Sequence, residues 1–183
     1  MENTIENKQE GMFKPALNYA LIISVVLIII SLVFYLAGSP TSKAIQYIGY
    51  VVVIAGLAYA AIMYRNEVLG GYITYGKSLG FIVVTGLITG VILGVYNFVF
   101  LSFIAPEVLE IMKEEITQRA YETAYQFNPN ISDAELDNMI DLQLRFQNPT
   151  LLAVFTIIGY TFQALILGLI ISIFVKRKNP ELV

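Results

Sequence analysis

The chain has 183 residues, of which 57% are hydrophobic and only 14% are charged. Average soluble domains are about 45–50% apolar and about 25% charged, so the composition excludes a soluble globular protein and indicates lipid as the solvent. The net charge of −3 leaves no basic surplus for a nucleic-acid partner. The sequence contains no Cys and no His, which excludes disulfides, thiol nucleophiles and the commonest zinc ligands.

Four apolar segments are long enough to cross a bilayer. A hydrocarbon core about 30 Å thick needs about 20 apolar residues in a helix. Each segment lacks an internal charge and is bounded by proline or by charged residues, which the membrane interface tolerates. We predict membrane helices over residues 15–37, 44–64, 78–104 and 150–175. The first is expected to be an uncleaved anchor, because its apolar run exceeds the roughly 7–15 residues of a signal peptide.

Lysine and arginine predict the orientation of these segments. With both termini inside, the inner segments hold seven basic residues and the outer segments hold four. The positive-inside bias therefore predicts cytoplasmic N- and C-termini. The inner residues are Lys8, Lys14, Arg65, Lys77, Lys176, Arg177 and Lys178, and the outer ones are Lys43, Lys113, Arg119 and Arg145.

The loop 105–149, between the third and fourth spans, is then extracytoplasmic, and it carries nine acids against three bases. Apolar residues recur there at helical spacing and predict an amphipathic helix over 106–127. Asn128-Pro129-Asn130 breaks the chain, and Ser132 with Glu135 forms a capping box that opens a second helix to about Phe146. The sequence thus predicts an all-α, single membrane domain over 1–183, a four-helix bundle with an extracytoplasmic amphipathic helical hairpin.

A glycine repeat marks one face of the third span. Gly86, Gly90 and Gly94 lie four residues apart, so they form a smooth surface that another backbone can approach closely. Three uses are open: helix packing within the bundle, which is favoured, a homo-oligomer contact, or a substrate path.

Hydrogen-bonding side chains inside the spans need partners, because lipid supplies none. The strongest candidates are Tyr96 and Asn97 in the third span and Tyr160 and Gln163 in the fourth. They are expected to join helices, with a hydrated, ligand-binding cavity as the alternative. Ion-coupled transporters usually carry charges within their spans, so the absence of such charges disfavours a pump or secondary transporter.

No residue pattern in the sequence indicates catalysis, a bound metal or a cofactor. The acidic stripe Asp133, Asp137 and Asp141 lies along a predicted helix and lacks the calcium-loop pattern, so a solvated face is favoured over a cation site. A nucleophile with a base, a phosphate loop and a metal cluster are all missing from the sequence. We therefore predict that the protein is not an enzyme.

Four short motifs resemble those of DUF4199, a bacterial inner-membrane family of unknown function common in the Bacteroidota. They are Gly71-Tyr-Ile-Thr-Tyr-Gly-Lys-Ser-Leu-Gly80, Phe103-Ile-Ala-Pro106-Glu, Ile131-Ser-Asp-Ala-Glu135 and Lys176-Arg-Lys178. The resemblance extends from about Lys14 to Lys178. It implies four spans in a bacterial inner membrane, and it implies no activity or catalytic residue.

These features predict a non-enzymatic structural or interaction protein of the membrane. Its expected partners are the lipid bilayer, a second copy of the chain at the glycine face, and an unidentified protein at the acidic loop. The alternative is a small oligomeric channel or transporter for neutral or lipophilic solutes, with Tyr96, Asn97 and Gln163 along the path.

Overall fold

The computed structural model describes residues 11–128 and 130–178, and all its elements are helical. In chain order they are α1 (Phe13–Leu36), α2 (Lys43–Met63), η1 (Tyr64–Val68), α3 (Tyr75–Val99), η2 (Phe100–Ile104), α4 (Pro106–Phe127), α5 (Asp133–Arg145) and α6 (Pro149–Val175). The segments η1 and η2 are π-helical and continue α2 and α3. The predicted all-α class is confirmed.

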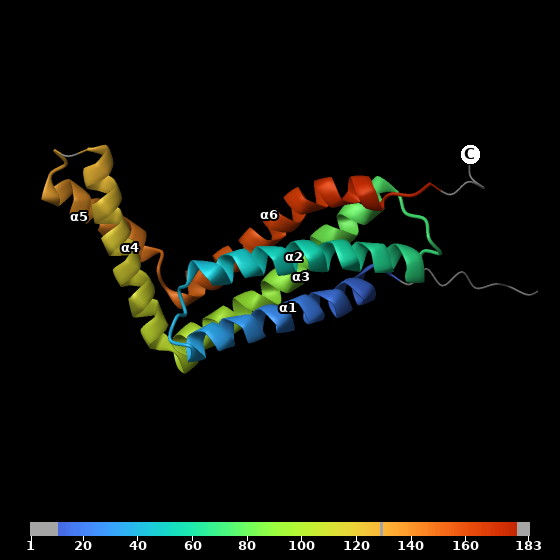
Figure 1. Ribbon diagram of the computed structural model, residues 1–183, viewed down its shortest axis with the longest axis horizontal. Coiled ribbons are helices and arrows are strands. Elements are labelled where there is room, and N and C mark those ends of the chain that lie inside the picture. The colour runs from blue at the N-terminus through green and yellow to red at the C-terminus, as the bar shows by residue number, and fades with distance from the viewer. Residues whose placement is uncertain (1–10, 129, 179–183) are drawn as a thin grey trace, which may run out of the picture.

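Four long helices form an elongated bundle (Figure 1). They are Phe13–Leu36, Lys43–Val68, Tyr75–Ile104 and Pro149–Val175, and each is long and apolar enough to cross a membrane. The predicted spans end within three residues of these bounds, except that the second helix continues as η1 to Val68. This arrangement indicates a multi-pass membrane protein.

Side-chain caps define where three of these helices begin. Ser42 Oγ accepts a hydrogen bond from the backbone N–H of Ala44 at 3.3 Å, and Thr74 Oγ1 accepts one from the N–H of Lys77 at 3.3 Å. At the start of α6, Asn148 Oδ1 accepts a hydrogen bond from the N–H of Leu151 at 2.9 Å. Each cap satisfies an N–H that has no partner within the helix, so a polar residue directly before each of these helices starts it.

One end of the bundle is closed by packing and hydrogen bonds. We call it the Gly70 end, because Gly70 lies there in the turn between η1 and α3. The fully buried rings of Tyr64 and Phe81 stack with their centroids 4.1 Å apart. Ile73 and Arg177 exchange two backbone hydrogen bonds, of 3.0 and 2.9 Å, which tie the turn before α3 to the end of α6. Arg65 donates to the carbonyl of Val175 at 3.0 Å, so the π-helical turn is joined to the same point.

At the opposite end α4 and α5 form an arm that projects beyond the bundle, with α4 steeply inclined to the four long helices (Figure 1). Tyr35 of α1 donates a 2.8 Å hydrogen bond to Glu107, and Thr41 donates one to Glu115. The base of the arm is therefore attached to α1 and to the turn that follows it. Ser132 Oγ accepts from the N–H of Glu135 at 3.3 Å, as a helix cap does. Pro129 of the predicted break, and Lys8 of the orientation count, lie outside the described residues.

Candidate functional site

The glycine face of α3 packs directly against α6. A Cβ added to Gly90 would lie 3.0 Å from the carbonyl oxygen of Ile157, and one added to Gly94 would lie 2.9 Å from that of Ala153. A Cβ added to Gly86 would overlap the Cβ of Ala164. All three glycines are buried, so the face predicted from their spacing is occupied by α6 of the same chain.

Buried hydroxyl groups complete this α3–α6 contact without needing partners in lipid. Thr85 and Thr89 each donate to the carbonyl four residues earlier in α3, at 2.8 and 2.9 Å. Ser172 of α6 donates to Ser78 Oγ at 3.0 Å. These bonds satisfy hydroxyls that the bilayer interior cannot solvate. The contact between α3 and α6 is therefore close, and its buried hydroxyl groups are hydrogen-bonded.

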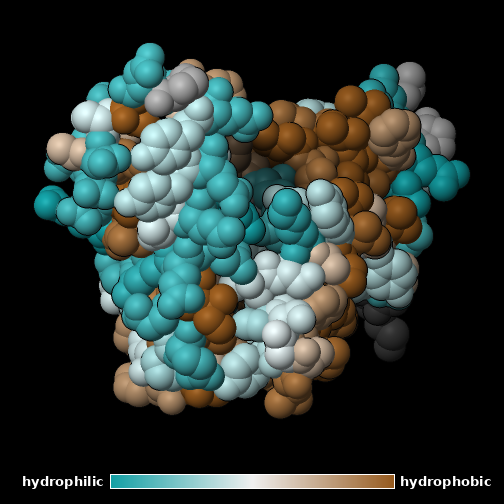
Figure 2. Space-filling model, turned by 60° about the vertical axis from the view of Figure 1, so that its left-hand side comes forward, coloured by the Kyte–Doolittle hydropathy of each residue, from teal (hydrophilic) through white to brown (hydrophobic). Residues whose placement is uncertain are grey.

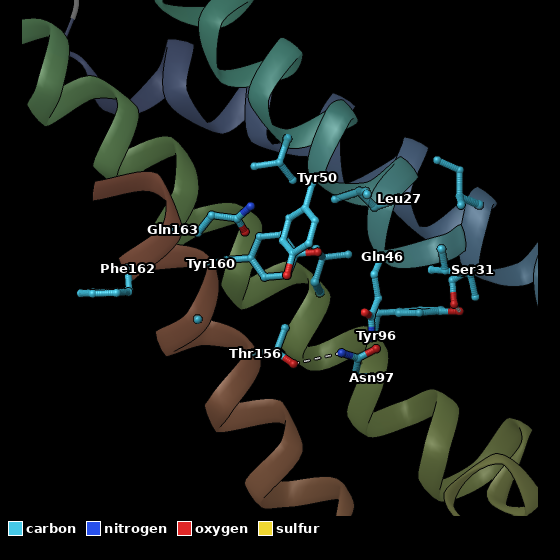
Figure 3. Close-up of a pocket in the computed structure, with 16 residues that line it drawn as sticks. Leu27, Ser31, Gln46, Tyr50, Tyr96, Asn97, Thr156, Tyr160, Phe162 and Gln163 are labelled. Carbon is cyan, nitrogen blue, oxygen red and sulfur yellow. Dashed lines mark hydrogen bonds between the residues drawn. The ribbon is translucent and has the colours of Figure 1, made fainter. Parts of the chain in front are cut away.

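The predicted intramembrane polar residues meet elsewhere, in a cleft of about 610 Å³ between α2 and α6. We call it the α2–α6 cleft; α1 and α3 also contribute to its wall (Figure 3). Its lining residues are Leu27, Ile30, Ser31, Ile45, Gln46, Gly49, Tyr50, Val53, Leu93, Tyr96, Asn97, Thr156, Gly159, Tyr160, Phe162 and Gln163. Tyr96, Asn97, Tyr160 and Gln163 are all among them, so the fold gathers the four residues that the sequence analysis singled out.

Two of these four residues are hydrogen-bonded across helices. Asn97 Nδ2 donates to Thr156 Oγ1 of α6 at 3.0 Å, and Thr156 in turn donates to its own helix at 2.8 Å. Tyr96 donates to Ser31 Oγ of α1 at 3.2 Å. These bonds join α3 to α6 and to α1 at the level of the cleft, so they act as links between helices and also as part of the cleft wall.

Other polar groups of the cleft have no such partner. Within residues 11–128 and 130–178, the side chains of Gln46, Tyr50, Tyr160 and Gln163 make no hydrogen bond. In Figure 3 the hydroxyl groups of Tyr50 and Tyr160 lie near one another, and Gln163 lies beside them. Their donors and acceptors therefore face the open volume of the cleft.

Position along the helices gives the depth of this site. Gln163 is fourteen residues beyond Pro149, so it lies about 21 Å along α6, near the middle of a helix about 40 Å long. Tyr50 and Phe162 flank the cleft on α2 and α6 and are 54% and 60% exposed. The cleft consequently opens on the side of the bundle, which lipid would surround in a membrane.

Towards the arm, the α2–α6 cleft adjoins a second cavity of about 390 Å³. The two share Ser31, Asn97 and Thr156, and the second cavity also contacts Val108 and Met112 at the base of α4. The two cavities therefore lie next to one another, with the hydrogen-bonded pair Asn97 and Thr156 in the wall of both.

Sequence reasoning missed the contribution of α2. Gln46 and Tyr50 lie four residues apart and so share one helix face, with Gly49 and Val53 beside them. The signal was present, because both are hydrogen-bonding side chains within a predicted span. The predicted polar residues all lie in the third and fourth spans, and Ser31 and Thr156 of the cleft were not among them.

The arm has a different character, with hydrophilic residues gathered over much of its surface (Figure 2). Tyr121 donates to Asp137, and Tyr125 donates to Asp133, each at 3.1 Å. Each carboxylate accepts a hydrogen bond from a tyrosine hydroxyl. This bond favours the protonated tyrosine and raises the pKa of Tyr121 and of Tyr125. Two of the three acidic-stripe residues thus bind α4, which accounts for their position without a metal ion.

An apolar groove of about 470 Å³ lies between α4 and α5. Its wall includes Ile116, Ala120, Leu136 and Met139. A second apolar row, formed by Met139 and Leu142 of α5 and by Phe146 directly after it, is exposed. The two helices therefore bury only part of their combined apolar surface against one another.

The family model for a protein of unknown function, DUF4199, matches residues 18–177 of the chain. The chain belongs to the DUF4199 family. The match begins within α1 and covers the other three long helices and the arm in full, and the family resemblance predicted from the sequence is confirmed. Searches of curated proteins and of solved structures find no match to this DUF4199 protein.

Proposed function

We propose that this DUF4199 protein is a non-enzymatic structural or interaction protein of the bacterial inner membrane. Its termini are cytoplasmic, and the arm is its extracytoplasmic contact element. The observation that carries the proposal is the exposed apolar row of α5, in which Leu142 is 58% exposed. Water around such a row is unfavourable, so an element that is fastened to the bundle and keeps the row uncovered is suited to bind another surface.

The attachment of the arm supports this role. Hydrogen bonds from Tyr35 to Glu107 and from Thr41 to Glu115 hold the base of α4 at a defined angle to the bundle. A contact element that is already oriented loses less entropy when it binds than a flexible loop would. Because the loop holds nine acids against three bases, the partner surface we expect is apolar at its centre and basic at its rim.

Site-specific crosslinking tests the proposal. The chain has no cysteine, so Leu142→Cys accepts a single photoreactive probe, and Glu114→Cys on the exposed surface of α4 is the matched control. We expect the probe at position 142 to give one defined protein adduct in native membranes, and Leu142→Glu to prevent pull-down of that partner. Adducts with lipid and with the arm itself alone would contradict the proposal.

The α2–α6 cleft favours a second candidate, an oligomeric channel or transporter for neutral or lipophilic solutes. Its wall includes Tyr96, Asn97 and Gln163, as a path for uncharged solutes requires. A complete path would also have to open the Gly70 end, where Tyr64 and Phe81 are fully buried. Asn97→Leu separates the roles: loss of flux with retained folding supports transport, and loss of folding alone supports a link between helices.

A further inference from the structure

We propose that the α2–α6 cleft binds one neutral amphiphile taken from the bilayer, with its hydroxyl- or carbonyl-bearing head group at Gln163, Tyr50 and Tyr160. The ligand class is an uncharged glycerolipid such as a diacylglycerol. This inference goes beyond the interaction role of the arm and does not depend on it. It rests on four properties of the cleft: its unused hydrogen-bonding groups, its uncharged lining, its volume and its lateral opening.

The cleft holds hydrogen-bonding capacity that the protein itself does not use. The amide of Gln163 offers two N–H donors and a carbonyl acceptor, and the hydroxyls of Tyr50 and Tyr160 each offer one donor. Hydrocarbon chains cannot satisfy these groups, and near the bilayer centre an unpaired amide is unfavourable. A ligand with hydroxyl and carbonyl groups can satisfy them at one point of the cleft wall.

The charge of the lining selects an uncharged head group. None of the sixteen lining residues is Asp, Glu, Lys or Arg. A phospholipid head group at this depth would bring its phosphate into an apolar region with no Arg or Lys to pair with, which is strongly unfavourable. Burial of hydroxyl and ester groups costs much less, and hydrogen bonds to the cleft residues offset that cost, so the site discriminates against phospholipids.

The size and the lateral opening of the cleft fit a small-molecule ligand that enters from lipid. The cleft volume of about 610 Å³ lies within the range of roughly 300–1,000 Å³ found for small-molecule sites. The apolar side chains of Leu27, Val53 and Leu93 line the same cleft and provide contacts for an acyl chain. The lateral opening gives access from lipid, and the bundle itself is packed at the Gly70 end, where Tyr64 and Phe81 are buried.

Photolabelling in nanodiscs of phosphatidylcholine tests the site with the full chain. A trace of photoreactive diacylglycerol is the neutral probe, and photoreactive phosphatidylglycerol is the anionic comparison. We expect the diacylglycerol to label peptides that contain Tyr50 or Tyr160, and the phosphatidylglycerol to label them much less. Competition by unlabelled diacylglycerol distinguishes a site from general contact with lipid.

Two variants make the test specific. Gly159 lines the cleft, and a Cβ built on it has no atom within 4 Å, so the side chain of Gly159→Leu begins in open space at the cleft. Gln163→Leu removes the amide but keeps a side chain of similar size. We expect Gly159→Leu to abolish labelling of the cleft, and Gln163→Leu to reduce it roughly 3- to 10-fold through loss of hydrogen bonds.

Thr161→Val on α6 is the control, because Thr161 bonds only to its own helix and is not a lining residue. Its labelling should equal that of the unaltered protein. Size-exclusion profiles of all variants show that they fold. Equal labelling by both lipids, or labelling of folded Gly159→Leu at the original level, would overturn the proposal. Neither outcome would alter the arm's crosslinks, so failure of the two proposals can be told apart.

Discussion

The contact between α3 and α6 predicts a strong and local effect of adding one methyl group. In Gly86→Ala the new Cβ would overlap the Cβ of Ala164 and would lie 3.2 Å from the carbonyl oxygen of Tyr160. Both neighbours belong to the facing helix backbone or are attached directly to it, so they cannot rotate away. The two helices must separate, which reduces contact along the whole glycine face.

The expected loss is about 1–3 kcal/mol of unfolding free energy, the usual cost of overpacking a well-packed contact. Gly159→Ala is the matched control, because it makes the same change within a helix but its Cβ has no atom within 4 Å. Both substitutions change helix propensity by the same residue types, so the difference between them isolates the packing term. We expect Gly159→Ala to be neutral or stabilising by up to about 1 kcal/mol.

Unfolding by SDS in mixed micelles provides the measurement. Because the native chain has no cysteine, dyes on two introduced cysteines report helix separation by fluorescence transfer. The double variant Gly86→Ala with Ala164→Gly removes the overlapping Cβ and should recover about 1 kcal/mol relative to the sum of the single effects. Equal stabilities of Gly86→Ala and Gly159→Ala, or an absence of coupling in the double variant, would refute this account of the glycine face.

Three further predictions concern single hydrogen bonds. Asn97→Leu should cost about 0.5–2 kcal/mol in the same SDS assay and little in a Thr156→Val background, where its partner is already lost. Ser132→Ala should cost about 1 kcal/mol of local stability, measured as faster hydrogen exchange in the first turn of α5. The hydrogen bond from Tyr121 to Asp137 raises the pKa of Tyr121, so its contribution persists below the unfolded value of about 10 and is lost as pH rises through the folded pKa. Exchange in the arm should therefore accelerate at high pH in the unaltered chain, and Tyr121→Phe should remove that component; an unchanged pH profile in the variant would contradict the assignment.

Local chemistry accounts for what could be predicted from the sequence. Each span needs only enough consecutive apolar residues to cross lipid, and its ends need only a cap, a proline or a charge. Pro149 therefore marks the start of α6 in the sequence as it does in the structure, and the structure adds Asn148 as the cap. The π-helical continuation at Tyr64–Val68 could not be predicted, because it depends on contacts with other helices: Tyr64 against Phe81, and Arg65 against the end of α6.

For the candidate site too, some features follow from the sequence and others only from the packing of the helices. Spacing alone places Gly86, Gly90 and Gly94 on one face, but three occupants were compatible with that face, and only the tertiary structure shows that α6 covers it. The cleft depends even more on tertiary structure, since Asn97 and Gln163 are 66 residues apart and Gln46 precedes Asn97 by another 51. The sequence by itself determined a membrane-embedded chain with uncharged polar groups in its spans, because burial in lipid acts on each segment separately. Only the packing of four helices decided that these groups share one cleft, because that depends on distances between residues that the linear order does not contain.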